Sequence, residues 1–73
     1  MVKRKIKQAL DGKLNELKMN LENNYKDLAR TALREYQELV EQYQSSGDLK
    51  EKDYRKYKQI ADEYAMRMQN YHH

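Results

Sequence analysis

Residues 32–61 read ALREYQELVEQYQSSGDLKEKDYRKYKQIA, and this segment contains the clearest turn signal of the chain between two helical patterns. At its centre, Gln44-Ser45-Ser46-Gly47-Asp48 gathers small and turn-forming residues between two periodic segments. Gly47 suits the left-handed backbone conformation that follows a helix end. Asp48, with Glu51 three residues later, can cap the next helix. We therefore expect a loop over residues 45–49 that separates two helices.

Apolar residues on both sides of this loop recur with helical spacing. After the loop the steps alternate between three and four residues, which is a heptad stripe typical of a coiled coil. Before the loop the steps are three, four and four, which is typical of a nearly straight helix. The stripes consist of Leu14, Leu17, Leu21, Tyr25, Leu28, Ala32, Tyr36, Leu39 and Tyr43, and then of Tyr54, Tyr57, Ala61, Tyr64, Met68 and Tyr71. The pattern predicts an all-α chain with helices over about residues 2–44 and about 50–71.

The two stripes also match each other when the chain is folded antiparallel about Gly47. Small residues then face small ones, and large residues face large ones. The facing pairs are Leu39 with Tyr54, Tyr36 with Tyr57, Ala32 with Ala61, and Tyr25 with Met68. Two unrelated helices have no reason to show such a match, so we predict an antiparallel helical hairpin over about residues 21–71.

Five apolar residues near the N-terminus continue the first stripe but find no partner in this hairpin. They are Val2, Ile6, Leu10, Leu14 and Leu17. Leaving such side chains in water forgoes roughly 1.5 kcal/mol or more for each large one, so we expect them to be covered. Two arrangements achieve this. Either one long helix runs to about residue 44 and its N-terminal half meets a second copy of the chain, or the chain turns at residues 22–24 and folds as a three-helix bundle.

Sequence features support each arrangement. The stripe keeps its phase across Asn23-Asn24, which favours the long first helix and self-association as a dimer. The three segments have nearly equal lengths, which favours the three-helix bundle within a single domain of 73 residues.

The sequence carries no pattern that points to catalysis. It contains no cysteine and none of the common motifs for phosphate, metal or nucleophilic chemistry. We therefore expect no enzyme, no cofactor and no metal site. The leading hypothesis is a small helical protein-interaction module, such as an adaptor, inhibitor or regulatory partner. Its predicted contact surface is the apolar face formed by Val2, Ile6, Leu10, Leu14 and Leu17.

The charges are unevenly distributed along the chain. Residues 1–21 carry a net charge of +4, residues 22–48 carry −3 and residues 49–73 carry +2. The alternative hypothesis is a nucleic-acid-binding accessory protein that uses the basic N-terminal segment, namely Lys3, Arg4, Lys5 and Lys7. The total of +3 is small for such a protein, so complementary charges between helices are the favoured explanation.

No stretch of the sequence has the length and hydrophobicity of a signal peptide or a membrane span. Together with the absence of cysteine, this predicts a cytoplasmic protein. The terminal His72-His73 is read either as native sequence or as the remnant of a purification tag.

Overall fold

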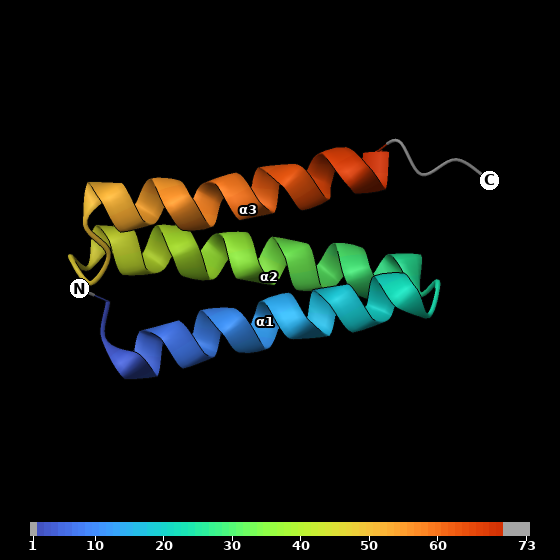
Figure 1. Ribbon diagram of the computed structural model, residues 1–73, viewed down its shortest axis with the longest axis horizontal. Coiled ribbons are helices and arrows are strands. Elements are labelled where there is room, and N and C mark those ends of the chain that lie inside the picture. Colours follow the sequence, from blue (N-terminus) through green and yellow to red (C-terminus); the bar gives the residue numbers. More distant parts are fainter. Residues whose placement is uncertain (1, 70–73) are drawn as a thin grey trace.

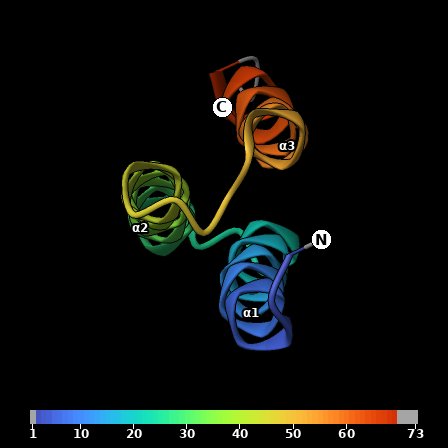
Figure 2. The same ribbon diagram turned by 90° about the vertical axis from the view of Figure 1, so that its left-hand side faces the viewer.

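The computed structural model describes residues 2–69, which form three α-helices and contain no strand (Figure 1). Helix α1 spans Arg4–Glu22, α2 spans Lys26–Ser45 and α3 spans Glu51–Gln69. The chain reverses at each turn, so α1 and α3 run in one direction and α2 runs in the other. Seen end-on, the three helices stand at the corners of a triangle (Figure 2). The predicted helix end at residue 71 and the His72-His73 pair lie outside the described residues.

The turn between α1 and α2 corrects the long first helix that the unbroken stripe favoured. Asn24 adopts a φ of 61°, in the left-handed region that asparagine tolerates better than most residues. The N–H of Tyr25 donates to the carbonyl of Asn20 at 2.8 Å, and the N–H of Asn24 donates to the carbonyl of Leu21 at 3.2 Å. These two bonds form a Schellman motif, which satisfies carbonyls that the end of α1 leaves free. The last turn of α1 therefore has hydrogen-bond partners for its carbonyls even though the helix ends there.

The turn between α2 and α3 has the same construction and lies where the sequence predicts it. Gly47 has a φ of 86°. The N–H of Asp48 donates to the carbonyl of Tyr43 at 2.9 Å, and the N–H of Gly47 donates to the carbonyl of Gln44 at 3.2 Å. The prediction that Gly47 follows a helix end in the left-handed conformation is confirmed.

Helix α2 is the shared partner of the other two helices. Both α1 and α3 pack on it, whereas within residues 2–69 no Cα atom of α1 lies within 8 Å of a Cα atom of α3. The core comprises Ile6, Leu10 and Leu17 of α1, Ala29, Ala32, Leu33, Tyr36 and Val40 of α2, Leu49 of the loop, and Tyr57 and Ala61 of α3. The apolar N-terminal stripe is therefore buried against the chain's own helices.

The predicted register between α2 and α3 holds near the second turn and fails near the first. The hydroxyl of Tyr36 donates to the backbone carbonyl of Tyr57 at 2.8 Å, so this facing pair is in contact. By contrast, Tyr25 and Leu28 are 55% and 56% exposed. The turn at residues 23–25 ends the helix before Tyr25, so the phase of the stripe does not carry across it. Ala29 is buried at this end instead.

Gly12 gives a test of local helix stability. It lies inside α1 at an exposed position, and a Cβ added there would meet no atom within 4 Å. We expect Gly12→Ala to raise the free energy of unfolding by about 1 kcal/mol, because alanine favours the helix more than glycine does. Urea denaturation measures the change.

The matched control is Gly47→Ala, which also faces open space but has a φ of 86°. Strain at this position should lower the free energy of unfolding by about 1 kcal/mol. Two shifts of the same sign would contradict the different backbone conformations of the two glycines.

Candidate protein-interaction surface

The surface that the sequence predicts for a partner is mostly inside the molecule. Ile6 is 5% exposed, and Leu10 and Leu17 are fully buried. Val2 and Leu14 are half-buried at the edge of the same core. The chain's own helices thus cover the face that the hairpin prediction left free.

The reason is that the apolar face of α2 is wider than the predicted stripe. It also includes Ala29, Leu33 and Val40, which the stripe omitted. Val40 lines a hollow of about 110 Å³ together with Ala61 of α3. Successive helical residues point about 100° apart, so Leu39 and Val40 are directed to different sides. A face this broad contacts two helices instead of one.

Two hollows lie between α1 and α3, one near each end of the helices. The first has a volume of about 530 Å³ and is lined by Val2, Arg4, Lys7, Asp53, Lys56 and Tyr57. The second has a volume of about 240 Å³ and is lined by Lys18, Leu21, Glu22, Tyr64, Arg67 and Met68. Neither hollow is lined by α2. We call the surface that joins these residues the α1–α3 groove.

The floor of the α1–α3 groove is apolar. Leu21, Tyr64 and Met68 are half-buried and line the second hollow. Leu14 lies two turns before Leu21 on the same face of α1, and Ile60 lies one turn before Tyr64 on α3; both are also half-buried. Directly packed helices have axes about 8–10 Å apart, and the wider separation of α1 and α3 leaves these side chains partly open.

The walls of the groove carry an excess of cations. The two hollows are lined by Arg4, Lys7, Lys18, Lys56 and Arg67, against only two acidic residues, Asp53 and Glu22. Within residues 2–69, none of these five cations has a carboxylate oxygen within 4.0 Å. Two of them lie over aromatic rings of the groove, with the Arg67 guanidinium 5.3 Å from the ring centre of Tyr64 and the Lys56 ammonium 6.0 Å from that of Tyr57.

The ion pairs of the described residues lie elsewhere. Lys13 of α1 donates to Glu35 of α2 at 2.6 Å and to Glu16 at 3.2 Å. The bond to Glu35, followed by that to Glu16, raises the pKa of Lys13, and the same lysine lowers the pKa of Glu35. This contact joins α1 to α2 on the side of α1 away from the groove. Because Glu16 and Glu35 pair with Lys13, they do not neutralise the cations of the groove. An acidic group of another molecule can therefore pair with those cations.

The structure places the predicted basic segment at one end of the groove. Lys3, Arg4, Lys5 and Lys7 are all exposed. Lys3 pairs with Asp48 at 3.6 Å, while Arg4 and Lys7 share the first hollow with Lys56 of α3. Lys56 and Arg67 are not among the site residues predicted from the sequence. The available signal was their position beside the heptad stripe of α3, but only the fold shows that they face α1.

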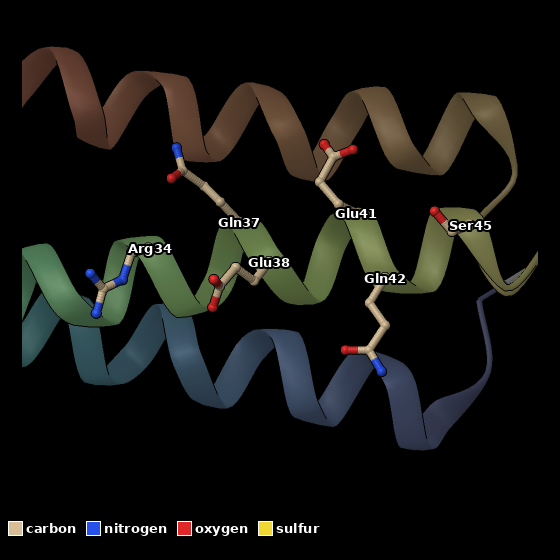
Figure 3. A pocket seen from close by; sticks show the side chains of 6 residues that line it. All are labelled: Arg34, Gln37, Glu38, Glu41, Gln42 and Ser45. Atoms are coloured by element: carbon tan, nitrogen blue, oxygen red, sulfur yellow. The ribbon is translucent and has the colours of Figure 1, made fainter.

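The outer face of α2 has a different character. A shallow depression of about 450 Å³ is lined by Arg34, Gln37, Glu38, Glu41, Gln42 and Ser45. Figure 3 shows Gln37 and Glu41 extending toward α3 and Gln42 extending toward α1, whereas Glu38 lies across α2 itself. The carboxylate of Glu41 accepts a bond from the Tyr54 hydroxyl at 2.6 Å. The two carboxylates diverge, so they do not form the convergent pair that acid–base catalysis requires.

Residues 2–69 contain neither a metal-binding cluster nor a membrane-spanning helix. No three histidine, cysteine or acidic side chains there gather closely enough to hold a metal ion. No helix among these residues has the length and hydrophobicity to cross a membrane. Comparisons with protein-family models, with curated proteins and with solved structures found no match to this chain.

Proposed function

We propose that this chain is a small, non-enzymatic protein-interaction module of the cytoplasm, which acts as an adaptor, inhibitor or regulatory partner. Its contact surface is the α1–α3 groove, which includes Val2 of the predicted N-terminal face, whereas Ile6, Leu10 and Leu17 of that face are buried in the core. One observation carries the proposal: half-buried apolar side chains line a groove between two helices that share α2 but do not contact each other closely. Open apolar surface of this kind, rimmed by charged residues, is typical of protein contact sites.

Site-specific photo-crosslinking in the native host tests this function. A benzophenone amino acid replaces Tyr64 in the groove, and the matched control replaces Gln37 on the outer face of α2. We expect one discrete protein adduct from position 64 and none from position 37. Equal labelling from both positions, or no adduct from position 64, would contradict a groove-specific interaction.

Self-association loses its physical basis when the N-terminal stripe is covered within one chain. A groove-to-groove dimer would bring the cations of one copy onto those of the other, and like charges oppose such pairing. We therefore expect sedimentation velocity to show a monomer from micromolar to near-millimolar concentration. A dimer within this range of concentrations would instead support self-association, with a second copy of the chain as the partner.

A second candidate function is nucleic-acid binding, and one observation favours it. The fold brings Arg4 and Lys7 of the basic N-terminal segment next to Lys56 of α3. Three neighbouring cations can contact few phosphates, so we expect weak binding that disappears near physiological salt. Gel shifts with a short duplex at low and physiological salt measure this binding. A complex that persists at physiological salt would make nucleic-acid binding the preferred function.

A further inference from the structure

We infer that the α1–α3 groove binds an acidic amphipathic helix of a different protein; this rests on the proposed function and specifies the partner. The groove is long enough to hold a helix. Its two hollows lie near opposite ends of α1, and Lys7 and Leu21, which line them, are about 21 Å apart at 1.5 Å per residue. An occupant that reaches both hollows must span that length, with apolar side chains for Val2 and Tyr57 at one end and for Leu21, Tyr64 and Met68 at the other. An amphipathic helix does so through residues at every third or fourth position.

The arrangement of the helices supports a helical occupant. Helices α1 and α3 run in the same direction and both pack on α2, as Figures 1 and 2 show. A fourth helix in the groove would contact α1 and α3 on the side opposite α2. The four helices would then have the geometry of a four-helix bundle. The fourth helix would cover Leu14, Leu21, Ile60 and Tyr64, which are now half-buried.

Charge specifies the chemistry of that helix. Five cations flank the groove, on both walls and at both ends, with no carboxylate within 4.0 Å in the part of the chain described. Within residues 2–69, Lys3, Lys13 and Arg55 each pair with a carboxylate, and none of these three lines the groove. Glutamate and aspartate on the flanks of a bound helix would pair with the groove cations. A basic or neutral helix would leave the cations unpaired or repelled.

A second copy of this chain is a poor occupant for two reasons. The outer face of α2 is acidic enough to approach the groove, but glutamine, glutamate, arginine and serine line its depression (Figure 3). Such a face has no apolar side chains to fill the groove floor. The groove itself is apolar, but pairing it with its copy sets cations against cations.

Binding of a defined synthetic helix tests the inference. The probe is a peptide of about 18 residues with leucine on one face and glutamate on both flanks. One control peptide carries lysine in place of glutamate, and another has the same composition in shuffled order. Titration calorimetry gives the affinities, and amide chemical shifts locate the contact. We expect only the acidic amphipathic peptide to bind, with shifts at Leu21 and Tyr64 and none at Gln37.

Charge reversal supplies the second measurement. Lys18→Glu combined with Arg67→Glu should weaken peptide binding at least about tenfold, because two contacts become repulsive. The matched variant Arg34→Glu combined with Arg55→Glu changes the net charge equally outside the groove lining and should leave the affinity unchanged. All four positions are exposed, and circular dichroism confirms that both variants remain folded.

Several outcomes would overturn the inference. These are equal binding of the lysine-flanked peptide, chemical shifts centred on the outer face of α2, or equal effects of the two charge-reversal pairs. A short oligonucleotide that displaces the peptide at physiological salt would assign the groove to nucleic acid. Photo-crosslinking from position 64 to a protein without an acidic helix would overturn the inference while leaving the proposed function in place. If position 64 gave no protein adduct at all, the proposed function would be contradicted as well.

Discussion

Replacing Leu10 and Leu17 together by glutamate is expected to unfold the chain. Both side chains are fully buried in the core between α1 and its neighbours. Two carboxylates there would lose hydration without gaining a partner, and the apolar contacts of both leucines would be lost. Small domains are stable by only about 5–15 kcal/mol, and each such change costs several kcal/mol. Circular dichroism should show most of the helical signal lost at room temperature.

The matched control is Gln8→Glu with Asn15→Glu on the same helix. Both positions are exposed, so the added charge is the same but the core is untouched. We expect this variant to keep its helical signal and to melt within a few degrees of the wild type. A Leu10→Glu, Leu17→Glu chain that stays helical and merely changes its sedimentation would instead indicate the long-helix dimer, in which those leucines contact a second copy.

The part of the α2–α3 register near the second turn was predictable because its signals are local and agree with one another. Gly47 is the only glycine between two periodic segments, and its left-handed conformation follows directly from its lack of a Cβ. The contact between Tyr36 and Tyr57 follows from antiparallel folding about that turn. Each step depends on residues close to the loop, so errors in helix phase have little length over which to accumulate.

The first turn was harder to predict because asparagine is an ambiguous signal. Asn24 adopts the left-handed conformation without the steric freedom of glycine, and the apolar stripe keeps its spacing across it. The end of α1 is fixed by the backbone hydrogen bonds that Asn24 and Tyr25 donate to its last turn. The spacing of the apolar residues does not reveal these bonds. The apolar stripe is therefore continuous in the sequence, although the helix is broken between Glu22 and Lys26.

The groove was not predictable from the pattern of either helix alone. Leu21, Tyr64 and Met68 follow the same spacing as fully buried residues, and the sequence does not show which members of a stripe stay half-open. Their exposure depends on how far α1 and α3 are held apart by their shared partner, α2. The wide apolar face of α2, with Val40 next to the predicted stripe, is the sequence feature that allows this arrangement.

Truncation of Tyr36 is the second change with a large expected effect. Tyr36 is the largest fully buried side chain of the described residues, and its hydroxyl donates to the Tyr57 carbonyl at 2.8 Å. Tyr36→Ala should lower the free energy of unfolding by about 3–5 kcal/mol, because it leaves a cavity between α2 and α3. Tyr36→Phe keeps the ring and should cost only about 1 kcal/mol for the lost hydrogen bond.

Urea denaturation of these variants gives the comparison, with Tyr25→Ala as the control. Tyr25 is 55% exposed, so its removal should change stability by less than about 0.5 kcal/mol. Similar losses from Tyr36→Ala and Tyr25→Ala would show that the predicted centre of the core is misplaced.

The same hydroxyl also makes stability depend on alkaline pH. Burial raises the pKa of Tyr36 above the ordinary tyrosine value, and the nearby Tyr57 and Asp11 raise it further. The folded state thus favours the protonated phenol, whereas the unfolded chain releases its proton near pH 10. The resulting stabilisation is complete below about pH 10 and is lost as the pH rises from there toward the folded-state pKa. Stability of the wild type should therefore fall between about pH 9 and about pH 11, while Tyr36→Phe, which has no phenol to ionise at this position, should fall less over the same interval. Urea midpoints at both pH values measure the difference, and parallel losses in the two proteins would mean that the Tyr36 hydroxyl is not held away from water.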